Sequence, residues 1–209
     1  MVVMIGTNAF TIFFNLLAVL NPLAVAAIYT SMIDGKTPAQ LKAITIQFTI
    51  ATAIIMLVSL WFGQAFLNIF GLNVPSFECA GGAILIIVGI RLILPKSNKD
   101  DMDSASGNVG NSIAIVPLAI PLCAGPGVIA ILIATGAEYP TFSQHLLLTG
   151  LSVLLAIICG IILYFAPRIA RKLGSTGMKT ISRVMGLIIT AIGFNILSKG
   201  FLGLFPGLH

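Results

Sequence analysis

Long apolar stretches separated by short polar ones run along the whole chain. Strict alternation of polar and apolar residues over about ten positions, which is typical of an outer-membrane β-strand, is absent. A helix needs about 20 apolar residues to cross the hydrocarbon core of a bilayer. Six segments are long enough to predict one membrane-spanning helix each: 9–33, 41–69, 77–94, 112–136, 145–167 and 180–205.

Composition strengthens this interpretation. Of the 209 residues, 58% are hydrophobic and 8% are charged, and the charged residues avoid the apolar stretches. A soluble domain carries about 25% charged residues. The sequence therefore predicts an all-α, multi-pass membrane protein that is surrounded by a lipid bilayer. No basic residue precedes the first segment, so we expect a membrane span there rather than a signal peptide.

The basic residues predict an orientation. With six spans, both termini lie on one side with the loops near 70–76 and 137–144. The opposite side holds the loops near 34–40, 95–111 and 168–179. Ten of the eleven Lys and Arg residues fall on this second side, and only Lys199 falls on the first. Because basic loops stay in the cytoplasm, both termini are predicted to lie outside. Membrane topology also explains the net charge of +5, so no nucleic-acid partner is expected.

The candidate metal-binding and catalytic residues are few. The three cysteines lie in apolar segments without Cys-x-x-Cys or Cys/His spacing, so we expect small buried residues and neither a disulfide nor a metal site. The spans hold no His-Glu-x-x-His motif and no paired aspartates. We therefore expect no enzyme and no cofactor.

The two halves of the sequence align without a gap at a constant offset of 104 residues. Pro22 then meets Pro126. Each half holds three spans, an odd number, so the second half would enter the membrane inverted, as in many secondary transporters. The sequence predicts two inverted three-helix repeats, 1–94 and 112–209, joined by a flexible cytoplasmic linker at 95–111.

Glycines in the third and sixth spans follow the same offset. Gly82 and Gly89 meet Gly186 and Gly193, and each pair is spaced by seven residues. This spacing places the two glycines of a pair on one helix face. Such faces let helices approach closely, so we expect these glycines to pack helices together rather than to contact a ligand.

Proline interrupts the first and fourth spans near the predicted middle of the membrane. In a continuous helix this costs about 3 kcal/mol, and hydrocarbon has no water to satisfy the freed carbonyls. Asn is a strong N-cap, and proline is favoured at the first helical position. Asn21-Pro22 and Gly125-Pro126 are therefore interpreted as the starts of two half-helices. A simple kink would explain one such break, but two matched breaks favour a binding site.

Helix starts expose N–H groups and the positive end of a helix dipole, and both attract a carboxylate. Carbonyls in the irregular stretches before them could bind an ammonium group or a cation. The free N–H groups are assigned to Leu23, Ala24, Gly127 and Val128. The predicted substrate-binding residues are Asn21, Pro22, Leu23, Ala24, Cys123, Ala124, Gly125, Pro126, Gly127 and Val128. Possible cavity-lining residues are Asn15, Thr49 and Asn195.

Other polar residues in the spans leave alternatives open. Thr45, Thr49, Thr52 and Ser59 form a stripe that could line a polar path or hydrogen-bond to neighbouring helices. Glu78 lies near the outer end of the third span. We expect an interfacial carboxylate there, with a role in proton coupling as the alternative.

The stretches NPLAVAAIYTSM and VPLAIPLCAGPGVIAILI resemble the paired signatures of the MarC family of six-span membrane proteins. ECAGGAILIIVGIRLI and SRVMGLIITAIGFNIL resemble the third and sixth spans of that family. Archaeal relatives known as SnatA are associated with transport of small neutral amino acids such as glycine and alanine. The resemblance implies a secondary transporter of such amino acids in the inner membrane of a prokaryote, working by alternating access.

Several properties stay open at this stage. The coupling ion could be H⁺ or Na⁺, and neither the direction of transport nor the oligomeric state follows from the sequence. A channel for small solutes, or an exporter of other zwitterions or of drugs, is the alternative function.

Overall fold

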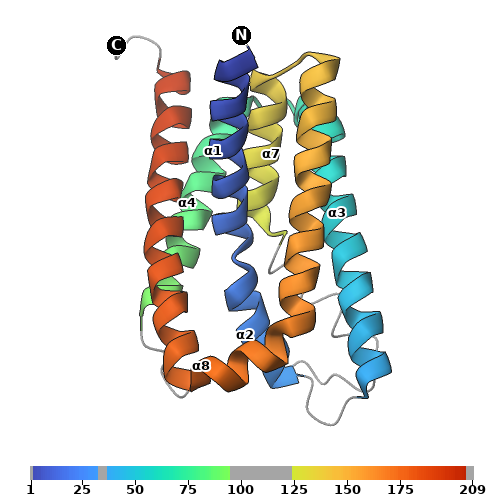
Figure 1. Ribbon diagram of the computed structural model, residues 1–209. Helices are drawn as coiled ribbons and strands as arrows, with labels where there is room; N and C mark the ends of the chain where they lie inside the picture. Colours follow the sequence, from blue (N-terminus) through green and yellow to red (C-terminus); the bar gives the residue numbers. More distant parts are fainter. Residues whose placement is uncertain (1, 33–36, 95–123, 206–209) are drawn as a thin grey trace.

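The computed structural model describes residues 2–32, 37–94 and 124–205, and all regular elements in these ranges are helices. The elements are α1 (Val2–Leu20), α2 (Pro22–Met32), α3 (Pro38–Ile69), α4 (Val74–Ile93), α7 (Pro126–Glu138) and α8 (Phe142–Leu204). Figure 1 shows them standing side by side in one elongated bundle. The predicted all-helical class is confirmed for the described residues.

Five segments are long and apolar enough to cross a membrane: Ala9–Ala26, Pro38–Ile69, Val74–Ile93, Phe142–Gly174 and Lys179–Leu204. They correspond to five of the six predicted spans. The described part of the remaining span, 112–136, begins at residue 124 and includes most of α7, which has 13 residues and ends at Glu138. The rest of that span and the predicted 95–111 linker lie outside the described residues.

The connection between two spans that was expected near 168–179 is present, but it is helical and belongs to α8, so the expectation of a loop without helical structure is wrong. Only Gly174 departs from helical geometry, with φ 65° and ψ 178°, a conformation that glycine adopts without a Cβ clash. No proline falls between 168 and 179, and most residues there are compatible with a helix. The segment crosses the lower end of the bundle between two long arms of α8, Phe142–Gly174 and Lys179–Leu204 (Figure 1).

Short-range capping fixes where α3 and the first arm of α8 begin. The Thr37 N–H donates to Gln40 Oε1 at 2.9 Å, and the Gln40 N–H donates to Thr37 Oγ1 at 3.4 Å. The Thr141 N–H likewise donates to Gln144 Oε1 at 3.2 Å. These capping boxes satisfy donors that a helix start leaves without an acceptor.

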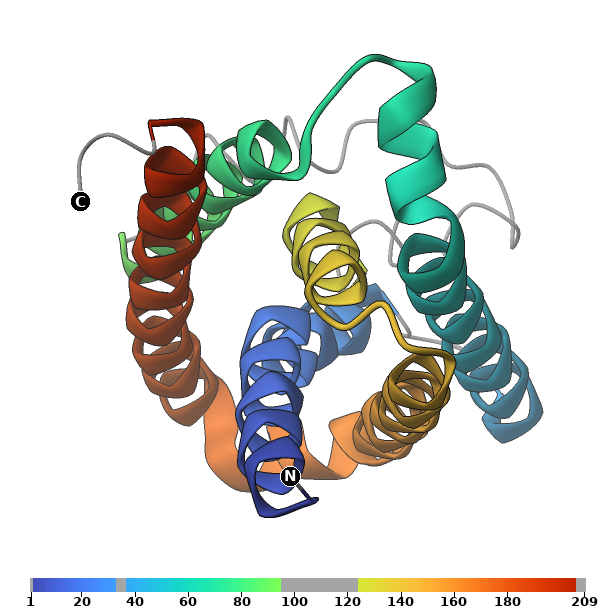
Figure 2. The same ribbon diagram turned by 90° about the horizontal axis from the view of Figure 1, so that it is seen from above.

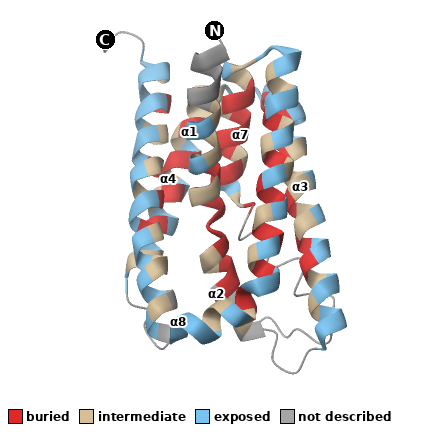
Figure 3. Cartoon of the chain, in the orientation of Figure 1, coloured by how far each residue is buried: buried red, intermediate tan, exposed pale blue. Residues whose placement is uncertain are grey.

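The shorter helices lie inside the bundle and the long ones surround them. Seen from above, α2 and α7 are enclosed by α3, α4 and the two arms of α8 (Figure 2). Buried residues concentrate on α2, α7 and the faces turned toward them, and the outer faces are exposed (Figure 3). These outer faces carry large apolar side chains, among them Ile54, Phe62, Ile87 and Ile161. Such surfaces suit contact with lipid rather than water.

Glycines join α4 to the second arm of α8. A β-carbon on Gly82 would lie 2.7 Å from the carbonyl oxygen of Gly193, and one on Gly89 would lie 2.6 Å from that of Gly186. Only glycine allows this backbone approach, so the predicted packing role of these residues is confirmed.

The ends of the helices group as the sequence predicts. The starts of α1 and α4 lie at the same end of the bundle as the α7–α8 turn and the end of α8 (Figures 1 and 2). The opposite end carries the crossing segment of α8. Which end faces the cytoplasm stays a prediction from the basic residues.

Candidate functional site

The first break is a single residue wide. Asn21 lies between α1 and α2 with φ 43°, a left-handed conformation that Asn tolerates better than most residues. Its N–H donates to the Leu17 carbonyl at 3.1 Å, and its own carbonyl accepts the Val25 N–H at 3.2 Å. Pro22 has no N–H to offer the carbonyl of Ala18, four residues earlier. Asn21 thus ends one helical ladder and begins the next.

The side chain of Asn21 caps α2 and keeps a donor unused. Its Oδ1 accepts the Ala24 N–H at 3.3 Å, as an N-cap should. The residue is only 6% exposed, and its Nδ2 has no hydrogen-bond partner within the described part of the chain. A buried donor without a partner costs about 1–3 kcal/mol, so this amide favours an acceptor from a ligand.

The start of α7 has a similar geometry. Gly125 is extended, with φ −70° and ψ −179°, and Pro126 is the first helical residue. The Gly125 carbonyl accepts the N–H groups of Val128 at 3.0 Å and Ile129 at 3.2 Å. Glycine brings no capping side chain, so this helix start presents backbone alone.

The assignment of free N–H groups needs a correction. The N–H groups of Ala24 and Val128 donate to carbonyls three residues earlier, which the sequence interpretation did not consider. The second residues of the two helices, Leu23 and Gly127, have no acceptor among the described residues. This matches the first turn of an α-helix, whose N–H groups have no acceptor within the helix.

One cavity is lined by both helix starts. It has a volume of about 190 Å³. The predicted site residues that line it are Asn21, Ala24, Gly125, Pro126, Gly127 and Val128. Leu85 of α4 and Ile189 of the second arm of α8 close its apolar walls. Two helix starts that are 104 residues apart in the chain therefore meet at one place.

A larger cavity lies on the other side of the first break, with a volume of about 690 Å³. It is bordered by the end of α1, the start of α2 and both arms of α8. The predicted residues that line it are Asn15, Asn21, Pro22, Leu23 and Asn195. Asn21 therefore borders both cavities.

The remaining predicted site residues are Cys123, Ala124 and Thr49. Ala124 is buried but does not line either cavity, and Cys123 lies outside the described residues. Thr49 lines a separate groove between α3 and the first arm of α8, beside Gly160. Its position on the polar stripe of α3 could not reveal which neighbour the stripe faces.

The polar stripe of α3 is mostly satisfied within the helix. Thr45, Thr49 and Ser59 donate their hydroxyl groups to carbonyls four residues earlier, at 2.7–2.9 Å. Thr52 is fully buried without a recorded partner in the described region. Thr45 and Thr49 line the groove between α3 and the first arm of α8, and none of the four stripe residues lines either cavity at Asn21.

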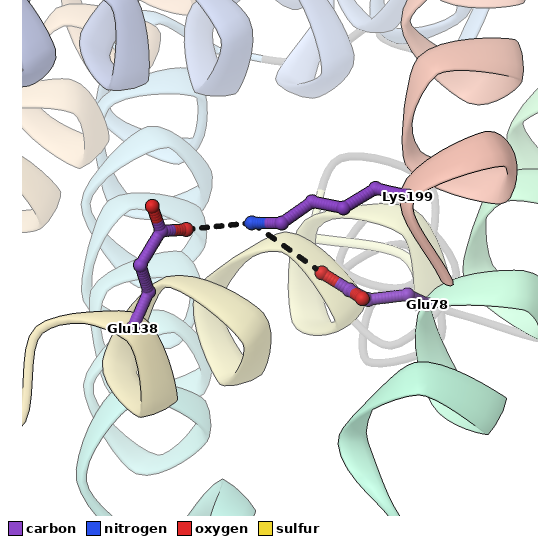
Figure 4. A network of polar contacts seen from close by, with 3 residues as sticks. All are labelled: Glu78, Glu138 and Lys199. Atoms are coloured by element: carbon purple, nitrogen blue, oxygen red, sulfur yellow. Dashed lines mark hydrogen bonds and ion pairs between the residues drawn. The ribbon is translucent and has the colours of Figure 1, made fainter. Parts of the chain in front are cut away.

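Glu78 has a partner that the sequence interpretation did not identify. It is only 5% exposed, and its Oε1 lies 3.8 Å from the Lys199 Nζ. Lys199 also binds Glu138 at 2.6 Å (Figure 4). Glu78 and Lys199 are each a single charge at the same predicted end of an apolar span, and this pattern could have indicated the pair. Within the described residues no three His, Cys, Asp or Glu side chains gather to hold a metal ion.

The profile of a family described as "MarC family integral membrane protein" matches residues 6–205. The chain belongs to the MarC family of integral membrane proteins. The resemblance that the Asn-Pro and Gly-Pro stretches indicated is thereby confirmed at the level of the family.

Relatives in this family match the chain over nearly its full length. The membrane protein YhcE of Escherichia coli is 33% identical over 202 residues, which cover 95% of this chain and 94% of YhcE. The membrane protein YvbG of Bacillus subtilis is 28% identical over 208 residues, covering 94% of this chain and 95% of YvbG. The E. coli inner membrane protein MarC is 28% identical, covering 93% and 94%. No solved structure matches the chain.

Proposed function

We propose that this MarC-family protein is a secondary transporter of small neutral amino acids of the glycine and alanine type, located in a prokaryotic inner membrane. The observation that carries the proposal is the cavity shared by the starts of α2 and α7. Among the residues that line this cavity, the N–H group of Gly127 and the Nδ2 of Asn21 are donors without acceptors in the described part of the chain. Two positive helix ends and these donors suit one carboxylate.

The walls of this cavity support a short, uncharged side chain. Apart from Asn21 and the backbone, its lining is apolar, and it includes Val25, Leu85 and Ile189. A charged side chain on the substrate, in addition to its carboxylate and ammonium, would be buried there without a partner, at a large cost in free energy. Glycine and alanine place only a hydrogen or a methyl group against these walls.

The positions of the helix starts support an inverted repeat. α2 begins at Pro22 and α7 at Pro126, and α3 begins at Pro38 and α8 at Phe142, so both pairs are separated by 104 residues. Helices that begin at equivalent positions in both halves are expected if the halves share one architecture. In secondary transporters, two such inverted halves move relative to each other around a central site to give alternating access.

The glycine contacts between α4 and the second arm of α8 support the same relation. At an offset of 104 residues, Gly82 aligns with Gly186 and Gly89 aligns with Gly193. The observed contacts are Gly82 with Gly193 and Gly89 with Gly186, so each contact is the other one seen from the opposite half. Such reciprocity is the property of two equivalent surfaces related by a twofold axis.

Counterflow in proteoliposomes tests the function. Vesicles loaded with unlabelled glycine or alanine should accumulate labelled glycine transiently and with saturation, because a transporter exchanges substrate. A channel would give neither saturation nor accumulation. Imposed H⁺ and Na⁺ gradients then identify the coupling ion, which we propose to be one of these two. Absence of exchange for every small neutral amino acid in correctly folded protein would reject the proposal.

A further inference from the structure

Three charged side chains from three helices meet at the end of the bundle where α1 begins and α8 ends. They are Glu78 of α4, Glu138 at the end of α7, and Lys199 near the end of α8 (Figure 4). The Lys199 Nζ donates to Glu138 Oε2 at 2.6 Å and lies 3.8 Å from Glu78 Oε1. Both glutamates of the sequence therefore lie within ion-pair distance of one lysine.

The two ion pairs of this cluster differ in their hydrogen bonding. The Lys199–Glu138 pair is half-exposed and has hydrogen-bonding geometry. The Glu78 side chain is only 7% exposed, yet its distance to Lys199 is too long for a hydrogen bond. A buried carboxylate is stabilised by hydrogen bonds as well as by charge. Glu78 can therefore accept a further donor, and the cluster carries one more negative than positive formal charge.

A cavity of about 270 Å³ opens on this cluster. Its lining includes all three charged residues together with Asn15 and Asn195. The same two asparagines line the 690 Å³ cavity that reaches Asn21. The charged cavity and the cavity that reaches Asn21 therefore share two polar lining residues.

We propose that this cavity is an outer binding site for a zwitterionic amino acid, an inference that takes its ligand class from the proposed function. The ligand ammonium binds Glu78, and the ligand carboxylate binds Lys199, which Glu138 holds in place. The ligand thereby replaces a long ion pair with two charge-assisted hydrogen bonds. The flexible stem of lysine lets Nζ move to make room. A metal cation fits less well, because the Lys199 ammonium would repel it.

Equilibrium binding of glycine to the purified protein tests this site. The unmodified protein should bind roughly two glycines, one in the outer cavity and one at the helix starts. Glu78→Gln or Lys199→Gln should weaken the outer site about tenfold or more, since each removes one charged hydrogen-bond partner. Lys42→Gln makes the same change on an exposed lysine near the start of α3 and should alter nothing.

Competition by ligands with a single charge tests the site without any substitution in the protein. Methylamine and acetate, each carrying one of the two charges, should not compete with glycine on the unmodified protein, whatever the folding of the variants. Competition by either alone at glycine-like concentrations would overturn the zwitterion site. So would glycine binding that is unaffected by both Glu78→Gln and Lys199→Gln. If glycine binding is unaffected by both substitutions but counterflow is retained, the outer site is rejected and the proposed function is kept. If the outer site binds glycine but no counterflow occurs, only the transport proposal is rejected.

Discussion

Asn21 combines three properties that no other residue type supplies at once. It tolerates φ 43°, its Oδ1 caps α2, and its Nδ2 remains available in a buried position. Glycine would accept the backbone conformation but has neither cap nor donor. Aspartate would cap the helix, but its ionised side chain has no hydrogen-bond donor.

This difference gives a test at Asn21. Asn21→Asp should leave folding largely intact, because the N-cap is kept. It should weaken glycine binding about tenfold or more, because the side chain loses its N–H donor and its carboxylate repels the carboxylate of the substrate. Calorimetric titration and thermal unfolding of the same samples separate the two effects. Asn21→Gly is the control that removes cap and donor without backbone strain. Unchanged binding by Asn21→Asp would show that Nδ2 does not face the substrate.

Gly127 offers a second test at the residue scale. A β-carbon there would lie 2.6 Å from Leu85 Cγ, so Gly127→Ala should cost about 1–3 kcal/mol of unfolding free energy. Shortening the neighbour by Leu85→Ala removes the clash. The double variant should therefore be more stable than the sum of the two single effects predicts. Its uptake should be lower than that of the unmodified protein, because the cavity has changed. Additive effects in the double-mutant cycle would mean that the two residues do not interact.

At the scale of elements, the contact between α4 and the second arm of α8 is backbone against backbone. A β-carbon at Gly82 would meet the Leu197 nitrogen at 2.6 Å, and one at Gly186 would meet the Gly89 carbonyl oxygen at 2.7 Å. Backbone atoms cannot turn aside as a side chain can. The two helices must separate to accept even a methyl group.

Paired substitutions test whether these two positions are equivalent. Gly82→Ala and Gly186→Ala should each lower the free energy of unfolding by about 1–3 kcal/mol, and by similar amounts, if the two helices are related by a twofold axis. Gly150→Ala in the first arm of α8 is the control. No atom lies within 4 Å of its added β-carbon, so it should be neutral or stabilise the helix. Thermal unfolding in detergent measures all three, and a large effect at only one of the pair would contradict the equivalence.

At the scale of the whole molecule, orientation is the main prediction. The end of the bundle with the crossing segment of α8 carries Arg168, Arg171, Lys172 and Lys179 on or next to that segment. The opposite end carries Lys199 alone among the described basic residues. Because positively charged segments are retained in the cytoplasm, the chain termini should lie outside.

Cysteine labelling checks this orientation in intact cells. With the native cysteines replaced, Pro140→Cys in the α7–α8 turn should react with an impermeant maleimide. Thr176→Cys in the crossing segment should react only after the cells are permeabilised. Both positions are exposed, so accessibility depends on the side of the membrane. Labelling of Thr176→Cys in sealed cells would reverse the orientation.

The sequence by itself determined the features that depend on neighbouring residues. Proline after Asn21 or Gly125 starts a helix because the ring fixes φ and removes an N–H, whatever surrounds it. The length of each apolar stretch sets which helices can cross a bilayer. The same local rules failed at 168–179, because a basic, polar stretch was interpreted as a loop although its residues can continue a helix.

The tertiary structure decided what the separated segments do together. It brought the starts of α2 and α7 to one cavity, and it placed Glu78, Glu138 and Lys199, which come from three helices, within reach of one another. It also showed that Thr49 faces a different groove from Asn15 and Asn195. Periodicity along one helix gives the face on which a residue lies, but the neighbour of that face depends on how the whole bundle packs, and this is set by contacts between residues far apart in the chain.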